Sequence, residues 1–121
     1  MAQKIPPELE QIILKYQQIE SQLASVITQK TVISSELKDV ERALSILQSV
    51  SPDTAVYKNT GFVFVKVDRD STIKELQEKK EELEVRLQSF ERIEESLRKQ
   101  FEAVKKELEK YRIVPGEGKS G

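Results

Sequence analysis

The chain has 121 residues, a formal net charge of −1 and charged side chains at 34% of its positions. This length suits one domain, and the even balance of charge argues against a dedicated nucleic-acid-binding protein, which would carry a basic excess. Histidine and cysteine are both absent, so we expect no catalytic site, no cofactor and no metal centre. Because no apolar run suits a membrane helix or a signal peptide, we expect a cytoplasmic protein away from membranes.

Apolar residues recur at alternating steps of three and four through the first part of the chain. This stripe, which we call the seam, runs from Leu9 to Leu47 and is interrupted only by Lys30. The same spacing recurs from Ile73 to Tyr111. A spacing near 3.5 residues that persists over several heptads predicts a coiled coil. An ordinary amphipathic bundle helix is the weaker alternative, because the stripe is narrow and never slips in register.

The segment between the two runs carries the turn signal NTG at residues 59–61. We expect a three-residue hairpin loop here, with Gly61 in the left-handed region and with AVYK and FVFVKV as the paired strands. The two helical runs are equally distant from Thr60, so the helices and the hairpin are expected to share that residue as their centre. The predicted fold is therefore mainly α, with one long antiparallel coiled coil and one central β-hairpin.

Helix-breaking and helix-capping residues give the expected bounds of these elements. Pro7 suits the first turn of a helix, and Pro52 ends one. Thr72 and Glu75 have the spacing of a capping box at the start of the second helix. The expected elements of this single domain, residues 1–121, are a helix over about 7–49, a β-hairpin over about 54–68, a helix over about 72–112 and a disordered tail over 115–121.

The predicted hairpin is apolar on both of its faces. Alternation along its second strand places Phe62 and Phe64 on one face and the valines between and after them on the other. A lone hairpin is marginal in water, and its open edges recruit other strands. We therefore expect hairpins of several chains to close a β-barrel; a hairpin folded down on its own helix ends is the alternative, but it leaves much apolar surface uncovered. The expected oligomer interface consists of Val56, Tyr57, Phe62, Val63, Phe64, Val65 and Val67.

Three segments resemble the β-type subunits of prefoldin of the archaeal type. They are PPELEQ, the linker DTAVYKNTGFVFVKVDRD and the second-helix run ELQEKKEELEVRLQSFERIEESLRKQ. The pattern of valine, tyrosine, lysine, glycine, valine and lysine from Val56 to Lys66 is the more specific part of this likeness, which spans about residues 7–111. Only one hairpin fits between the helices, whereas the α-type subunits carry two, and this favours the β type.

The resemblance implies a hexamer of two α-type and four β-type chains. Their hairpins would form a double β-barrel base from which six coiled-coil arms extend. Such assemblies hold unfolded client proteins between the ends of the arms and pass them to a group II chaperonin without using ATP. The resemblance thus implies an α-type prefoldin subunit, unfolded proteins and a group II chaperonin as the partners of this chain, and no nucleic acid or membrane.

Apolar residues outside the seam gather near the free end of the predicted coiled coil. Ile13 and Leu14 lie off the seam, in a stretch of the first helix that carries few charges. Taken with the resemblance, they predict a client-binding tip, although end packing that merely closes the coiled coil is the alternative. The expected tip residues are Ile5, Leu9, Ile12, Ile13, Leu14, Leu108, Tyr111, Ile113 and Val114.

Lys30 and Glu94 are polar residues at seam positions, on opposite helices. With the helices centred on Thr60, they occupy adjacent layers, so the ammonium is expected to reach the carboxylate. A polar residue in a seam costs stability but can fix the register. Independent projection of both charges into solvent is the alternative.

Three functions compete on the sequence alone. The first is an ATP-independent chaperone subunit, and the second is a coiled-coil spacer or oligomerisation module without a client surface. The third, a nucleic-acid-binding coiled coil, is disfavoured because residues 73–111 hold ten basic and eleven acidic side chains. No catalytic constellation is present in the sequence, and the chain is not expected to be an enzyme.

Overall fold

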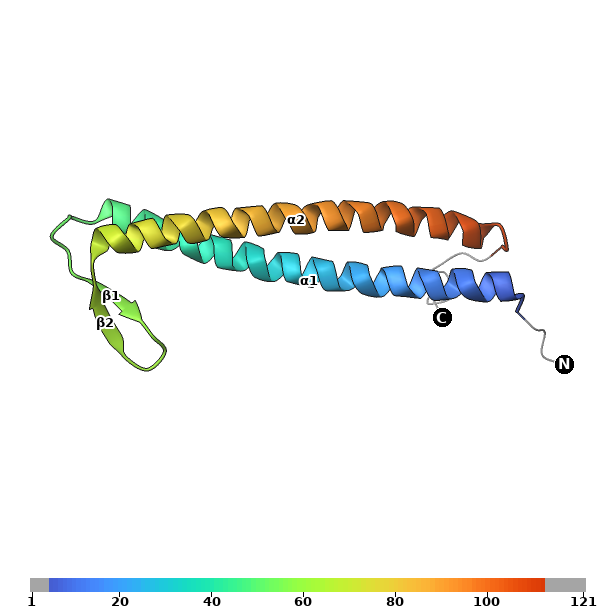
Figure 1. Ribbon diagram of the computed structural model, residues 1–121, viewed down its shortest axis with the longest axis horizontal. Coiled ribbons are helices and arrows are strands. Elements are labelled where there is room, and N and C mark those ends of the chain that lie inside the picture. The colour runs from blue at the N-terminus through green and yellow to red at the C-terminus, as the bar shows by residue number, and fades with distance from the viewer. Residues whose placement is uncertain (1–4, 113–121) are drawn as a thin grey trace. The chain divides into compact units, whose positions relative to one another are not determined.

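The computed structural model describes residues 5–112, which form two long helices and one β-hairpin (Figure 1). The expected tail over 115–121 lies outside the described residues. In chain order the elements are α1 (Pro7–Ser49), β1 (Val56–Asn59), β2 (Phe64–Val67) and α2 (Arg69–Glu109).

Proline sets both limits of α1, as the sequence indicates. Pro7 is its first residue, and the carbonyl of Pro6 accepts a hydrogen bond of 3.0 Å from the amide of Glu10. Proline is tolerated at this position because the amide it lacks would have no partner within the helix. After the last helical residue, the chain turns at Pro52, and the amide of Thr54 donates to the carbonyl of Ser51 at 2.9 Å.

The start of α2 differs from the prediction, because the cap is Asp68 and not Thr72. The amide of Ser71 donates to Oδ2 of Asp68 at 2.9 Å, so α2 begins at Arg69 rather than near residue 72. Thr72 lies inside the first turn, where its hydroxyl donates to the Asp68 carbonyl. An aspartate at the cap satisfies a free amide and places negative charge at the positive end of the helix dipole. The hydrogen bonds from Ser71 also lower the pKa of the Asp68 carboxyl.

The seam predicted from the sequence is the buried stripe of both helices. Every seam position between Leu9 and Leu108 is buried or half-buried, and only the last, Tyr111, is exposed. A strict repeat of this kind keeps one narrow face of each helix turned toward the other. The remaining faces of both helices therefore stay in contact with solvent.

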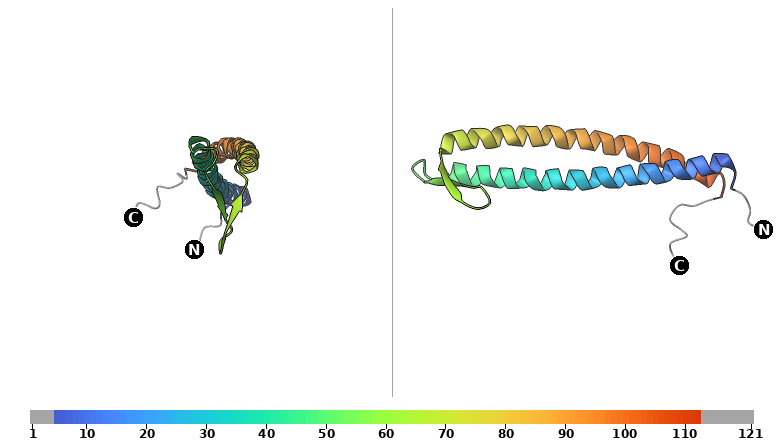
Figure 2. Two further views of the ribbon diagram at one scale, coloured as in Figure 1. Left: turned by 90° about the vertical axis from the view of Figure 1, so that its left-hand side faces the viewer. Right: turned by 60° about the horizontal axis from the view of Figure 1, so that its bottom comes forward.

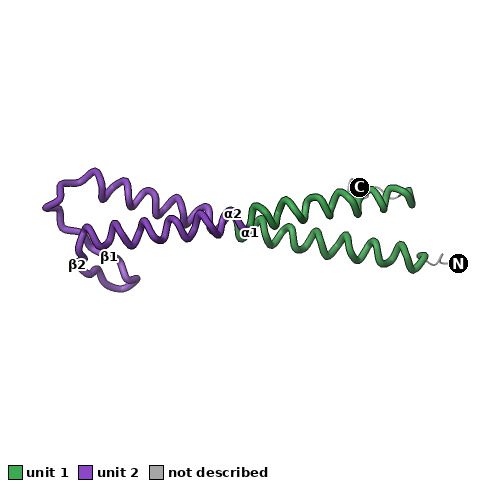
Figure 3. The backbone as a smooth tube through the Cα atoms, turned by 45° about the horizontal axis from the view of Figure 1, so that its top comes forward, with its two compact units in different colours: residues 1–30, 90–121 green, residues 31–89 purple. Residues whose placement is uncertain are grey.

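The structure divides into two compact units (Figure 3). The terminal unit comprises residues 1–30 and 90–121, and the hairpin unit comprises residues 31–89. In the terminal unit, Ile19 and Val26 of α1 form a buried cluster with Leu97 and Val104 of α2. Half-buried residues pack around this cluster, among them Tyr16 and Phe101, whose ring centres lie 4.9 Å apart.

The hairpin unit contains the other half of the buried stripe together with the two strands. Leu83 of α2 is fully buried, and Ile33, Val40 and Leu44 of α1 are buried as well. The helices run antiparallel in this unit. Glu36, early in this part of α1, lies beside a later part of α2, with 3.6 Å between its Oε1 and Nζ of Lys79. The end of α1, in contrast, lies beside the start of α2. The hairpin projects away from the helices in Figure 1 and in the left-hand view of Figure 2.

The centre of the hairpin lies one and a half residues further along the chain than predicted. Asn59 pairs with Phe64 and Val56 with Val67, so the centre lies between Gly61 and Phe62 rather than at Thr60. The hairpin is therefore not centred on Thr60. The cause is the turn, Thr60–Val63, which begins one residue later than predicted and contains four residues instead of three.

Hydrogen bonds within the turn explain its length. The amide of Thr60 donates to the carbonyl of Val63 at 2.9 Å, and the Thr60 hydroxyl donates to the same carbonyl. The side-chain oxygen of Asn59 accepts a bond from the amide of Gly61, as in an Asx turn. Gly61 has a φ of 102°, so the expectation of a left-handed glycine is confirmed.

Replacing Leu83 with alanine should lower the free energy of unfolding by about 2–5 kcal/mol, because it opens a cavity in the seam. The matched control is Val85→Ala, which removes an exposed side chain of the same helix and should cost no more than ~0.5 kcal/mol. Denaturant unfolding followed by circular dichroism at one protein concentration measures both. Equal losses in the two variants would contradict the assignment of Leu83 to the core.

Candidate assembly and client-binding surfaces

The observed pairing decides which hairpin side chains share a face. Residues that pair directly lie on the same face, so one face carries Tyr57, Asn59, Phe64 and Lys66, and the other carries Val56, Lys58, Val65 and Val67. The prediction that Phe62 and Val63 lie on opposite faces of the second strand was wrong, because both belong to the turn. The two residues project from the end of the hairpin instead.

Most of the apolar hairpin surface is uncovered. Phe62 is fully exposed, and Phe64 is 72% exposed. Tyr57, Val63 and Val65 are exposed too. Only Val56 and Val67, the pair nearest the helices, are half-buried. The hairpin therefore presents aromatic and aliphatic side chains to solvent on both faces and at its turn.

A groove runs between the base of the hairpin and the helix ends. Its lining includes Ile46 and Leu47 from α1, Leu76 from α2, and Val56 and Tyr57 from β1. Ile46 is itself 55% exposed. Apolar side chains of the hairpin and of both helix ends thus line one groove, together with polar residues such as Lys58 and Glu75.

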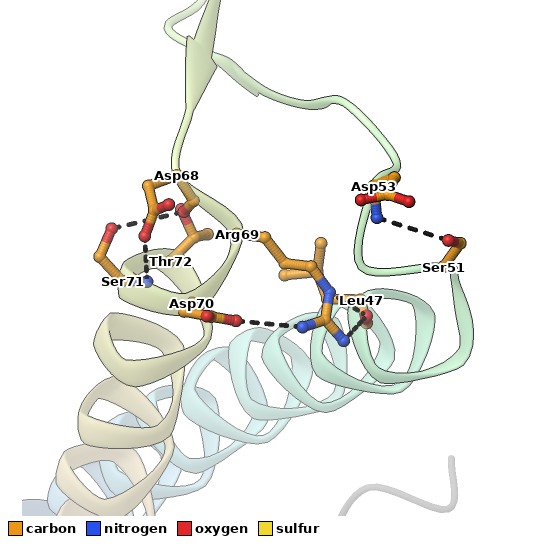
Figure 4. Close-up of polar contacts among 8 residues, drawn as sticks. All are labelled: Leu47, Ser51, Asp53, Asp68, Arg69, Asp70, Ser71 and Thr72. Atoms are coloured by element: carbon orange, nitrogen blue, oxygen red, sulfur yellow. Dashed lines mark hydrogen bonds and ion pairs between the residues drawn. The ribbon is translucent and has the colours of Figure 1, made fainter.

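One arginine joins the two helix ends beneath the hairpin (Figure 4). Nε and Nη2 of Arg69 donate to the carbonyl oxygen of Leu47 at 3.1 and 2.9 Å. Nη1 of the same side chain lies 3.1 Å from Oδ1 of Asp70. Arg69 is the first residue of α2, whereas Leu47 belongs to the last turn of α1. The side chain therefore connects two elements that are distant in sequence.

The predicted client-binding tip divides into accessible and covered residues. Ile5, Leu14 and Tyr111 are exposed, and Ile12 and Ile13 are half-buried. Leu9 and Leu108 are buried in the seam, so they reach a client only if the helix ends separate. Ile113 and Val114, which the sequence also places in the tip, lie outside the described residues.

The polar contact between Lys30 and Glu94 is present within the terminal unit. Lys30 Nζ lies 2.9 Å from Oε1 of Glu94, whose side chain is 14% exposed. The second oxygen of this carboxylate is held by Arg98, with Nη2 and Nε at 2.7 and 2.8 Å. One carboxylate thus binds two cations, one from each helix. Its role in fixing the register stays a prediction.

These contacts change the acidity of Glu94. The hydrogen bond from Lys30 and then that from Arg98 hold the pKa of the carboxyl below its ordinary value, although desolvation acts in the opposite direction. In the same unit, burial raises the pKa of the Tyr16 hydroxyl, and the Glu20 carboxylate adds to the effect. Glu94 therefore stays charged at neutral pH and keeps both partners.

Sequence reasoning missed two arginines of these sites. Arg98 lies four residues after Glu94, a spacing that brings two side chains of a helix together, so this partner was predictable. Arg69 carries a weaker signal. The only hint is that α1 lacks a basic residue in its last turn while an arginine follows the hairpin directly.

The described residues lack three features that would point to another kind of site. Residues 5–112 contain no cluster of acidic side chains fit to hold a metal ion. No buried side-chain nitrogen or oxygen in this range lacks a hydrogen-bond partner. Neither helix, within the same range, is long and apolar enough to cross a membrane. The candidate functional surfaces are therefore the hairpin and the tip.

Comparison with known proteins identifies the family. The model of the prefoldin subunit family matches residues 10–112, nearly the whole described chain. The chain belongs to the prefoldin subunit family. Among its relatives are the prefoldin subunit beta of Archaeoglobus fulgidus, 40% identical over 88% of this chain and 91% of the relative, and that of Pyrobaculum arsenaticum, 37% identical over 100% of this chain and 98% of the relative.

A solved structure supports the same assignment at the level of the fold. The crystal structure of the prefoldin beta subunit from Thermococcus strain KS-1 has a TM-score of 0.80 and 32% identity to this chain. The match covers 94% of this chain and 100% of the other. The likeness to β-type prefoldin subunits inferred from the sequence motifs is confirmed, as is the fold of two helices with a single hairpin.

In this prefoldin chain, the coupling between Lys30 and Glu94 is expected to depend on pH. A double-mutant cycle with Lys30→Met and Glu94→Gln should give a favourable coupling energy at pH 7. Because folding lowers the pKa of Glu94, this contribution is complete above the ordinary carboxyl value of 4.5 and is lost as the pH falls below it. Thermal unfolding at a series of pH values measures it.

The control pair is Lys99 and Glu95 of the same unit. Nζ of Lys99 lies 3.5 Å from Oε1 of Glu95, but both side chains are mostly exposed. Its coupling should be close to zero at every pH. If the Lys30 and Glu94 cycle gives no more coupling than this control, this partly buried pair does not fix the register.

Proposed function

We propose that this chain is a subunit of an ATP-independent chaperone that holds unfolded proteins and delivers them to a group II chaperonin. In this proposal the hairpin is the assembly surface, an α-type prefoldin subunit is the partner, and two α-type and four β-type chains form the complete particle. The tip of the terminal unit binds the client, and the setting is the cytoplasm. The observation that carries the proposal is the contrast between a covered seam and an uncovered apolar hairpin.

The exposure of the hairpin supports a role in assembly. Both strands are edge strands, since the two-stranded sheet consists of β1 and β2 alone. Edge strands with free amides and carbonyls add further strands readily. Closure of several hairpins into a barrel would also cover the exposed Phe64 on one face of the sheet, and Phe62 at the turn adds apolar surface for contact with a neighbouring chain. A two-stranded hairpin gains more from this pairing than a larger sheet, because it buries so little by itself.

The tip supports binding of unfolded chains through apolar contact. Leu14 and Ile5 offer exposed apolar surface at the start of α1, and Tyr111 does so at the end of α2. Contacts of this kind are not directional, so they suit clients of many sequences. They need no bound nucleotide, and the chain has no glycine-rich phosphate loop. Several arms that act together would multiply a weak individual affinity.

A spacer without client binding is the alternative, and one experiment separates it from the chaperone. The assembled particle, added to a denatured protein that is diluted from guanidinium, should suppress light scattering in the absence of ATP. A particle of correct mass that leaves the scattering unchanged would support the spacer and contradict the chaperone proposal. Native mass of the chain, alone and after mixing with an α-type subunit, establishes the particle first.

The double variant Phe62→Ser and Phe64→Ser should lower the mass of the assembly while helix content stays nearly unchanged. The two rings supply exposed area at the hairpin, whereas the helices are stabilised separately along the seam. Native mass spectrometry with an α-type subunit measures the first effect, and circular dichroism the second. The control, Val32→Ser with Val85→Ser, removes two exposed valines from the helices of the same unit. An unchanged mass for the phenylalanine variant would refute the hairpin as the assembly surface.

Replacing Ile5 and Leu14 with serine should weaken suppression of client aggregation severalfold, with assembly unaffected. Both side chains are exposed, so the change removes apolar surface without opening a cavity. Val32→Ser is the matched control, since it removes a comparably exposed apolar side chain of α1 outside the tip. Full suppression by the double variant would show that clients bind elsewhere.

A further inference from the structure

The end of α1 depends on a cation that α1 does not itself carry. The last carbonyls of any helix have no partner within it and form the negative end of its dipole. In α1, the carbonyl of Ile46 is satisfied locally, by the hydroxyl of Ser49 and by the amide of Val50. The next carbonyl, that of Leu47, accepts both hydrogen bonds from Arg69, while the last turn of α1 has no basic residue.

The guanidinium is held in place from several directions. Two of its nitrogens point at one carbonyl oxygen, and a third pairs with the Asp70 carboxylate (Figure 4). The side chain is 21% exposed, so solvent competes only in part for these bonds. A planar fork of donors suits this geometry better than the single ammonium of lysine.

The hairpin is attached to the two helices very unequally. Only Asp68 separates β2 from α2, and its carboxylate is committed to the first turn of α2. On the other side, residues 50–55 lie between α1 and β1. A one-residue connection leaves far less freedom than a six-residue one. The direction of the hairpin therefore follows the start of α2, and the start of α2 is tied to α1 by Arg69.

We propose that Arg69 is a positioning residue for assembly, which holds the start of α2 against the end of α1 and thereby fixes the direction in which the hairpin leaves the helices. This inference rests on the proposed role of the hairpin as the assembly surface. A hairpin with a fixed direction meets its partners without a further loss of orientational freedom, so assembly is stronger than it would be with a freely swinging hairpin.

The test combines a distance measurement with an assembly measurement. The chain has no cysteine, so spin labels placed at Ser45→Cys in α1 and Lys58→Cys in β1 report the hairpin direction in the unassembled chain. Both positions are exposed and belong to the hairpin unit. The variants are Arg69→Met, which keeps an unbranched apolar stem but no donor, and Arg69→Lys, which keeps the charge. Arg42→Met is the control, because Arg42 is exposed in the same unit and has only a long contact of 3.9 Å to Asp39.

We expect Arg69→Met to broaden the distance distribution and to raise the concentration needed for half-maximal assembly with an α-type subunit about tenfold, as the loss of hydrogen bonds to a charged group implies. Arg69→Lys should lie between Arg69→Met and the unchanged chain in both measurements, and Arg42→Met should match the unchanged chain.

An unaltered distance distribution in Arg69→Met would overturn the inference, and so would a broadened distribution with full assembly. If Arg69→Met loses helix content, the Arg69→Lys variant provides the test instead. The inference is then overturned if Arg69→Lys matches the unchanged chain in both the distance distribution and the assembly concentration.

The failure of the proposed function has a different signature. If the variant Phe62→Ser with Phe64→Ser assembles fully, the hairpin is not the assembly surface, whatever Arg69→Met does. If that variant fails to assemble while Arg69→Met assembles normally, the hairpin is the assembly surface and Arg69 does not position it.

Discussion

Burial of two narrow heptad stripes against each other is the constraint on which this structure depends. A pair of helices can cover only one stripe on each partner, so nearly all the apolar burial in the described chain occurs at seam positions. Leu83 and Val104, the most deeply buried side chains, both lie there. Most of the surface available to partners therefore lies outside the seam, in contact with water.

The hairpin and the tip are two such surfaces, and they differ in a way that suits two roles. The hairpin concentrates aromatic and β-branched side chains on a small sheet with unpaired edges, which favours a specific and lasting interface. The tip exposes scattered apolar side chains, Ile5, Leu14 and Tyr111, within the helices or beside their ends. Assembly through the first and transient binding through the second are compatible in one chain, because the two surfaces belong to different compact units.

Two polar contacts lie where the seam by itself leaves freedom. A heptad stripe would remain apolar after a slip of one heptad, but the carboxylate of Glu94 would then lose Lys30 from the facing helix. At the other end of the stripe, Arg69 joins helix termini that the seam brings near but does not connect. Both contacts are charge-assisted hydrogen bonds of a partly buried side chain, which are stronger than those of an exposed pair.

The sequence by itself determined the two helices, the seam, the presence of one hairpin and the likeness to β-type prefoldin subunits, because these depend on periodicity and on local residue types. It also indicated the approach of Lys30 and Glu94, since two helices of equal length that fold back on each other leave few registers. Only the tertiary structure decided the pairing of the hairpin, where the Thr60 side chain and backbone bond to Val63 and lengthen the turn to four residues. It also decided that Asp68 rather than Thr72 caps α2 and that Arg69 reaches Leu47. The sequence does not predict the turn or the cap, because several local hydrogen-bonding arrangements of similar energy are open to each. It does not predict the partner of Arg69, because a long side chain meets that partner only after distant segments have come together.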